Sequence, residues 1–151
     1  MKKIASLALI IFLGLQTVKA QLGRTYDEII SNFGTTHETS TPDQLETSIV
    51  NHQQDTSASN GFIHYQLQDS SAVSGKYIRS VYFYFTPPKH GDEYCNEELI
   101  LEPSSEIDSW IDMYKSKYEE IGYRIYKDKT NNVLFKVRIK GNFCVVNIWY
   151  E

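Results

Sequence analysis

Residues 133–150 read VLFKVRIKGNFCVVNIWY, and this stretch decides the fold class. Within Val133–Lys140, one set of alternate residues is apolar throughout and the other carries Lys136, Arg138 and Lys140, which is the period of a strand with one buried face. Lys140-Gly141-Asn142 has the composition of a turn, and Phe143–Tyr150 returns as a second strand. The two strands predict an antiparallel hairpin whose solvent side carries Lys136, Arg138 and Lys140.

Four further strands are expected upstream of this hairpin. Phe62–Gln68 alternates between apolar and polar residues, which is typical of a half-buried strand. Tyr77–Phe85 is apolar on both faces apart from Arg79 and Ser80, so we expect it in the middle of the sheet. The remaining two are Cys95–Glu102 and Tyr123–Lys127.

Two helices are predicted between the strands. A short one begins after Thr25, a good N-cap residue, and ends at Gly34. A longer one follows Pro103, with Ser105 and Asp108 at capping-box spacing and Gly122 as its end. Its apolar stripe at steps of three and four is Ile107, Trp110, Ile111, Tyr114, Tyr118 and Ile121. The fold class is therefore α+β: an antiparallel sheet of about five to six strands with helices packed on one face.

The order of these elements is helix, three strands, helix, three strands. The helices end alike, at Phe33-Gly34 and Ile121-Gly122, and each cysteine falls in the third strand of its half. This pattern indicates a duplicated αβββ unit, although chance spacing explains it as well. Residues 35–61 are polar and do not predict a definite structure, apart from a helix start at Thr41-Pro42.

Residues 1–20 are predicted to be a secretory signal peptide, followed by a single domain over residues 21–151. Lys2 and Lys3 precede an apolar run from Ile4 to Leu15, and Val18-Lys19-Ala20 provides a cleavage site. The run is too short to span a membrane, so we expect an exported protein, periplasmic or extracellular, with no transmembrane segment in the mature chain. The full chain has 15 basic and 19 acidic residues; removing Lys2, Lys3 and Lys19 leaves 12 basic residues and a charge of −7. This balance argues against nucleic acid as a partner.

Cys95 and Cys144 are the two thiols of the chain. Export to an oxidising compartment predicts a disulfide between them, which would close a loop of about 50 residues. Two alternatives stay open: two buried free thiols, or Cys95 as a nucleophile assisted by His90.

The first helix carries a family resemblance. Residues 23–34, GRTYDEIISNFG, follow the pattern G-x-T-x-x-x-[VI]-x-x-x-[LF]-G, and the segment resembles BamE/SmpA-like and β-lactamase-inhibitor-like envelope proteins. The resemblance implies helices on one face of an antiparallel sheet and a function in binding other proteins. The chain departs from those families because Thr35 and Thr36 stand where a proline is common, and the lipidated cysteine of BamE is missing. Otherwise the whole chain is similar to small secreted bacterial proteins of unknown function.

Candidate catalytic groups cluster between His90 and Glu98. His90, Asp92, Glu93 and Cys95 offer metal ligands within six residues, but a second pair of ligands with zinc-site spacing is missing. Nor does the sequence hold a nucleophile elbow, a zincin motif or a nucleotide-binding loop. We therefore assign no catalytic residue, no metal and no cofactor, and keep a small hydrolase or metal-dependent enzyme using the His90–Glu98 region as the alternative function.

Aromatic residues favour a binding function. The chain has 11 Tyr and 2 Trp, and such side chains on a rigid sheet make good anchors for proteins or sugars. The leading hypothesis is a non-catalytic domain that binds an envelope protein or polysaccharide through the sheet face turned away from the helices. Its expected binding residues are Tyr82, Tyr84, Arg138, Lys140 and Trp149.

Overall fold

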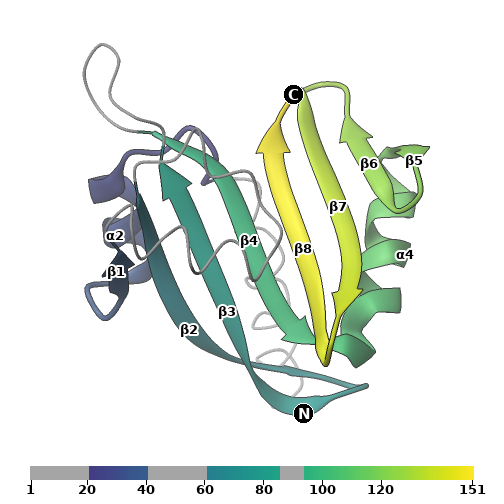
Figure 1. Ribbon diagram of the computed structural model, residues 1–151, viewed down its shortest axis with the longest axis horizontal. Helices are drawn as coiled ribbons and strands as arrows, with labels where there is room; N and C mark the ends of the chain where they lie inside the picture. The colour runs from purple at the N-terminus through teal and green to yellow at the C-terminus, as the bar shows by residue number, and fades with distance from the viewer. Residues whose placement is uncertain (1–20, 41–60, 86–93) are drawn as a thin grey trace, which may run out of the picture.

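A computed structural model describes residues 21–40, 61–85 and 94–151 (Figure 1). The predicted signal peptide, the helix start at Thr41-Pro42 and the segment that contains His90 lie outside these residues. The elements are α2 (Tyr26–Phe33), β1 (Glu38–Ser40), β2 (Gly61–Ser71), β3 (Gly75–Phe85), β4 (Cys95–Pro103), a 3₁₀ turn η2 (Ser104–Glu106), α4 (Ile107–Lys117), β5 (Glu119–Gly122), β6 (Ile125–Asp128), β7 (Val133–Lys140) and β8 (Phe143–Tyr150).

The strands form one antiparallel sheet in the order β1-β2-β3-β4-β8-β7-β6-β5. The sheet has eight strands rather than the expected five to six. The two additional strands, β1 and β5, lie at the edges and span only 3 and 4 residues, too few to give a clear alternation. Each helix is thus followed by four strands in this structure, and β4 and β8 pair at the centre of the sheet.

The first helix forms where its capping residues predict it. The Thr25 hydroxyl accepts a hydrogen bond from the backbone N–H of Glu28, and the Glu28 carboxylate accepts one from the backbone N–H of Thr25. This reciprocal pair is a complete capping box. Gly34 ends the helix with φ 95°, a left-handed value that favours glycine.

The second helix is shorter than predicted. It starts after a 3₁₀ turn, its N-cap is Glu106, and that cap makes no side-chain hydrogen bond, so the capping box expected at Ser105 and Asp108 is wrong. The helix ends at Lys117, and Glu119–Gly122 forms β5 instead of its last turn. Ile121 has the helical spacing of the apolar stripe, but its backbone is extended because β5 pairs with β6.

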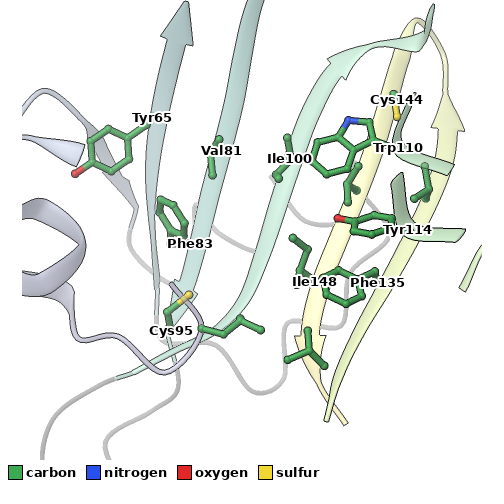
Figure 2. Close-up of a cluster of buried hydrophobic side chains, with 14 of the residues drawn as sticks. Tyr65, Val81, Phe83, Cys95, Ile100, Trp110, Tyr114, Phe135, Cys144 and Ile148 are labelled. Atoms are coloured by element: carbon green, nitrogen blue, oxygen red, sulfur yellow. The ribbon is translucent and has the colours of Figure 1, made fainter. Parts of the chain in front are cut away.

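Both helices pack on the same face of the sheet, which we call the helix face. Its register aligns one apolar residue from each of five strands: Tyr65, Val81, Ile100, Val146 and Val137. The helices pack on this row and on the rows beside it. The ring centroid of Phe33 in α2 is 5.3 Å from that of Tyr65 and 5.1 Å from that of Phe83. Tyr114 of α4 contacts Phe135 at 4.6 Å. Trp110 and Tyr114 are buried in the same hydrophobic cluster, as predicted, and the cluster runs from one helix to the other (Figure 2).

Candidate binding face of the sheet

The residues between those of the helix face point to the other side of the sheet, which we call the opposite face. One row of the register crosses it from β2 to β6. The members of this row are His64, Tyr82, Leu99, Asn147, Lys136 and Ile125. All five residues that the sequence predicts for binding belong to strand positions of this face: Tyr82, Tyr84, Arg138, Lys140 and Trp149.

The centre of the opposite face holds a second hydrophobic cluster. Tyr84, Leu99, Leu101 and Val145 are buried there, and Phe62 and Tyr82 pack against them. Tyr84 is only 1% exposed, so it packs within the face and is not accessible as a surface anchor. Burial raises the pKa of its phenol well above the usual value. Tyr82 and Trp149 are partly exposed.

Stacked rings order the β2–β3 side of this cluster. The His64 and Tyr82 rings are almost parallel, at 6° and 4.2 Å between centroids. Tyr84 lies parallel to Tyr82 at 6.4 Å, and Phe62 meets both tyrosines edge to face. Such ring pairs stabilise the fold beyond the contribution of the apolar area that they bury, and they fix side-chain orientation. This part of the face is therefore preorganised.

Basic side chains occupy the β7 side. Lys136, Arg138 and Lys140 alternate along β7 on the opposite face, as the sequence predicts, and each is partly exposed. Glu97 of β4 accepts a hydrogen bond from the Asn147 amide at 3.1 Å. Burial lowers the pKa of the Arg138 guanidinium, while the charge of Glu97 acts in the opposite direction.

One end of the face exposes apolar side chains. Ile78 is 50% and Phe143 52% exposed. Phe143 lies between Pro103 of β4 and Lys140 of β7 in the register. Sequence reasoning did not select Ile78 or Phe143, because their position at this end of the face depends on pairing between strands that are distant in the chain. Large exposed apolar groups next to basic ones are suited to recognition.

The cysteines lie on the helix face, and the predicted disulfide is wrong. Both thiols are free and buried. Cys144 is opposite Glu102 in the β4–β8 ladder, seven residues along β4 from Cys95. At about 3.3 Å per strand residue the separation is roughly 23 Å, whereas a disulfide needs Cα atoms within about 7 Å. Figure 2 shows the two sulfurs at different ends of the cluster.

The described part of the His90–Glu98 region does not gather catalytic groups. Burial raises the pKa of the Cys95 thiol, which is the reverse of what an activated nucleophile needs. Glu97 lies on the opposite face and Glu98 on the helix face, so the two carboxyls are on different sides of the sheet. Among residues 21–40, 61–85 and 94–151, no group of three or more His, Cys, Asp or Glu side chains is arranged to hold a metal ion.

Glu98 is an unusual member of the helix face. It occupies the row that also contains Ile63, Phe83, Ile148 and Phe135, and it is 1% exposed. Burial raises the pKa of its carboxyl well above the usual range, although the carboxyl also accepts a hydrogen bond from the Leu22 backbone. The direction of this shift reflects the cost of burial, since a carboxylic acid is much cheaper to bury than a carboxylate.

A small cavity adjoins Glu98 on the helix face. Its volume is about 20 Å³, which is the size of a single water site and too small for an organic ligand. Residues of α2, β2, β3 and β4 line it: Phe33, Leu67, Arg79, Val81, Phe83, Glu98 and Ile100.

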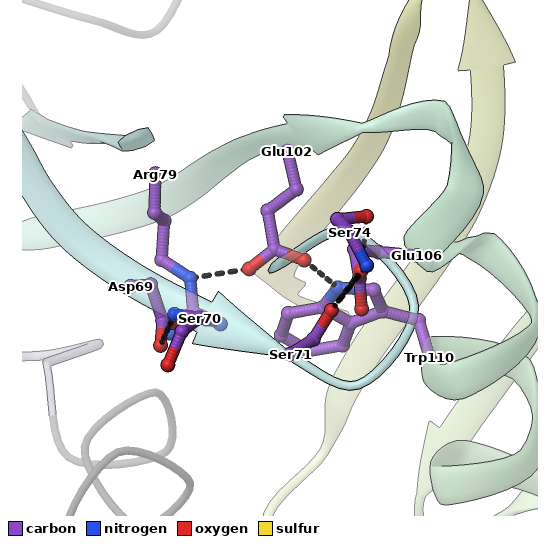
Figure 3. Close-up of polar contacts among 8 residues, drawn as sticks. All are labelled: Asp69, Ser70, Ser71, Ser74, Arg79, Glu102, Glu106 and Trp110. Atoms are coloured by element: carbon purple, nitrogen blue, oxygen red, sulfur yellow. Dashed lines mark hydrogen bonds and ion pairs between the residues drawn. The ribbon is translucent and has the colours of Figure 1, made fainter. Parts of the chain in front are cut away.

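A second buried carboxyl, that of Glu102, organises a polar network (Figure 3). It accepts hydrogen bonds from Arg79 Nε and, at 2.6 Å, from Trp110 Nε1. Arg79 also pairs with Asp69 at 2.8 Å. Burial lowers the pKa of Arg79, but the charges of Glu102 and Asp69 outweigh it and raise that pKa overall. The network connects β2, β3, β4 and α4.

The hairpin turn between β2 and β3 is fixed by a neighbouring carboxylate. Glu106, at the start of α4, accepts hydrogen bonds from the hydroxyls of Ser71 and Ser74. Ser74 also contacts the Ser105 hydroxyl. The long hairpin of the first half is thereby attached to the helix of the second half, so the network is structural.

Comparison with known proteins gives no relative: no protein-family model, curated protein or solved structure matches this chain. The resemblance of residues 23–34 to BamE/SmpA-like and β-lactamase-inhibitor-like proteins therefore stays a prediction. Within the ranges that the structure describes, no helix has the length and apolar character needed to cross a membrane.

Proposed function

We propose that this protein is an exported, non-catalytic α+β domain that binds another protein of the cell envelope through the opposite face. The observation that carries the proposal is the segregation of charge between the two sides of the sheet. The chain as a whole has a net charge of −4. In contrast, β2, β3, β4, β7 and β8 place on the opposite face four basic residues, Lys76, Lys136, Arg138 and Lys140, and a single acid, Glu97.

This distribution favours a partner with a carboxylate-rich surface. A basic patch on an acidic protein orients it during encounter, because the patch is attracted to the partner while the rest of the molecule is repelled. Affinity then needs apolar contacts in the same place. Ile78 and Phe143 supply them at the Lys140 end of the described face, and the partly exposed Trp149 supplies another six residues along β8 from Phe143.

The proposed interface has two differently equipped sides. The β2–β3 side offers the partly exposed rings of Phe62 and Tyr82, and the β7 side offers cationic groups along one strand. We also propose that the two halves derive from one duplicated helix-and-four-strand unit, since their elements follow in the same order and the sheet order is mirrored about β4–β8. In that case the two sides have diverged in chemistry while keeping the same scaffold.

The test is a crosslinked pull-down of Gln21–Glu151 from an envelope extract of its source, followed by titration of the purified captured protein. Lys140→Glu and Phe143→Thr alter the opposite face, and Lys117→Glu makes the same charge change as Lys140→Glu on α4. We expect the first two to weaken binding about 10-fold or more and Lys117→Glu to leave it within about 2-fold. Equal binding by all three variants contradicts the proposed face, and capture of an acidic polysaccharide instead of a protein contradicts the proposed partner class.

Export is tested separately. We propose that residues 1–20 are removed on secretion, so the mass of the protein recovered from outside the cytoplasm should correspond to a chain that begins at Gln21. Recovery of the intact chain in the cytoplasm would contradict the proposed location.

A further inference from the structure

The tip of the β5–β6 hairpin exposes an aromatic residue that the fold does not use. Tyr123 is 82% exposed, the highest value among the exposed large hydrophobic residues of the described chain. The preceding Ile121 is also exposed. The tip lies at the edge of the sheet beside α4, on the side remote from α2 (Figure 1). A single exposed tyrosine is common on protein surfaces, so what sets Tyr123 apart is the fixed backbone of the tip and its arginine neighbour.

The backbone of the tip is held in place. The backbone N–H of Val137 in β7 donates to the Arg124 carbonyl at 3.0 Å. The backbone N–H of Arg124 donates to the Glu120 carboxylate at 3.3 Å. A bulge between Glu120 and Gly122 shifts the β5–β6 register next to the tip. The tip is therefore fixed to the neighbouring strand on one side and to its own hairpin on the other.

Arg124 adopts a conformation that arginine seldom has. Its φ is 54°, in the left-handed region. Asn132, in the next turn, has φ 52°, but asparagine occurs in this region several times more often than arginine does. Strained residues of this kind are retained where the surrounding structure enforces them, and they concentrate at functional sites. Glycine would meet the backbone requirement of the tip at lower cost, which directs attention to the arginine side chain.

That side chain lies over the exposed ring. The Arg124 guanidinium is 5.0 Å from the Tyr123 ring centroid, within cation–π range. The pair therefore presents an aromatic surface and a cation in a set relative position. Tyrosine and arginine are among the residue types most often found as anchors at protein interfaces, and a prearranged pair loses less entropy on binding.

A second copy of this chain is a poor occupant for the edge. Antiparallel pairing of two β5 strands would place four glutamates, Glu119 and Glu120 of each copy, within paired segments of only 4 residues. Within the chain these carboxylates pair with lysines, Glu119 with Lys129 at 2.6 Å and Glu120 with Lys115 at 3.9 Å. Like charges opposite each other across a ladder are destabilising. The charge pattern thus disfavours extension of the sheet by a copy.

We propose that the β5–β6 tip is a recognition element that inserts Tyr123 into an apolar pocket of a different protein, with a carboxylate at the mouth of the pocket to accept hydrogen bonds from Arg124. The apolar part of the contact is the tyrosine ring, which buries about 150–250 Å² when fully enclosed. The positive charge of Arg124 favours a carboxylate at the mouth of the partner's pocket. This site is separate from the opposite face, and it stands whether or not that face binds a partner.

The experiment places a photo-crosslinking amino acid, benzoylphenylalanine, at position 123 of the full chain expressed in its own source. The matched control places it at Val73, which is 63% exposed in the turn between β2 and β3. We expect position 123 to give a discrete protein adduct that position 73 does not give, with the crosslinked peptide next to an Asp or Glu of the partner. Equal adducts at both positions, no adduct at 123, or adducts to lipid or glycan each overturn the proposal.

Variants of the tip then test the roles of the two side chains against the purified crosslinked protein. We expect Tyr123→Ala to weaken binding about 30-fold, and Tyr123→Phe to stay within about 3-fold. Arg124→Gly relieves the strained backbone and removes the guanidinium, so it should fold at least as well as wild type yet bind about 10-fold more weakly. Unchanged binding by both Tyr123→Ala and Arg124→Gly overturns the proposal, and a thermal melt of each variant shows that the fold is intact.

Discussion

On the helix face of this sheet Glu98 and Glu102 lie inside the hydrophobic core, whereas on the opposite face Lys136 and Arg138 keep part of their surface in water. Both pairs come from inner strands of the sheet, β4 and β7. The carboxyls are accommodated by different means: Glu102 has a cation and an indole N–H as partners, whereas burial favours the protonated form of Glu98 by raising its pKa. The basic side chains need neither, because they are not fully desolvated.

Replacing a charged side chain should therefore have different effects on the two faces. A charged group in the core is bound to its partners, so its replacement acts on folding. A basic group at the surface has small net effects on folding and is available to a partner. Charge on the helix face therefore serves the fold, and charge on the opposite face is where the proposed binding function can be tested without loss of stability.

The largest expected effect is at Glu102. Glu102→Ala leaves the Arg79 guanidinium and the Trp110 N–H without their shared acceptor in a buried site. We expect a loss of about 3–5 kcal/mol in the free energy of unfolding, measured by urea titration. Glu102→Gln keeps an acceptor for Trp110 and should lose less. If Glu102→Ala costs under about 1 kcal/mol, the assignment of this network to architecture is wrong.

The next effect depends on pH and concerns Glu98. Because its pKa in the folded protein is raised, the folded state binds a proton that the unfolded chain has already released. The stability of the wild type is therefore full at low pH and falls as the pH rises from the unfolded pKa toward the folded one, by at most about 1.4 kcal/mol per pH unit. The Glu98→Gln side chain cannot ionise. The free energy of unfolding of this variant, relative to that of the wild type, should therefore rise between pH 4 and pH 8.

The control for this measurement is Glu97→Gln, which makes the same change one residue away on the opposite face. Urea titrations of the three proteins at pH 4, 6 and 8 separate the two positions. If both variants show the same trend with pH, the cause is net charge and not burial of Glu98.

The sequence predicts local features well. The bounds of β7 and β8 and the N-cap of α2 at Thr25 are confirmed, because the period of a strand and a helix cap are decided by neighbours in the chain. Strand β5 was missed because Ile121 continues the helical spacing of α4. Residues 119–122 form a strand because they pair with β6, and the local sequence pattern does not predict that pairing.

Features that depend on register could be predicted only in part. Period two correctly placed the β7 basic residues on one face, but it did not indicate that Tyr84 would be buried at the centre of that face. The disulfide failed for the same reason: an even number of cysteines says nothing about which ends of β4 and β8 meet. The partners of Glu102 come from β3 and α4, and only the fold brings them together.

The two thiols on the helix face should react slowly in the native protein. Burial raises the pKa of Cys95, and it raises that of Cys144 to about 12, so neither supplies much thiolate near neutral pH. We expect alkylation by iodoacetamide at pH 8 to be at least about 100-fold slower in the native protein than in denaturant. Without any reductant, mass spectrometry of the denatured sample should show two adducts. A denatured sample that gains adducts only after reduction would restore the disulfide.

The smallest effect on stability is expected on the opposite face, where the proposed binding residues lie. Lys140 and Phe143 face each other at the end of the β7–β8 hairpin, and neither is fully buried. Lys140→Glu and Phe143→Thr should therefore change the free energy of unfolding by less than about 1 kcal/mol, because surface strand positions tolerate β-compatible replacements. Urea titration checks this, and the same samples go into the partner titration. A face that loses binding while it keeps stability is an interaction surface; one that loses several kcal/mol belongs to the core, and the division between the two faces would then fail.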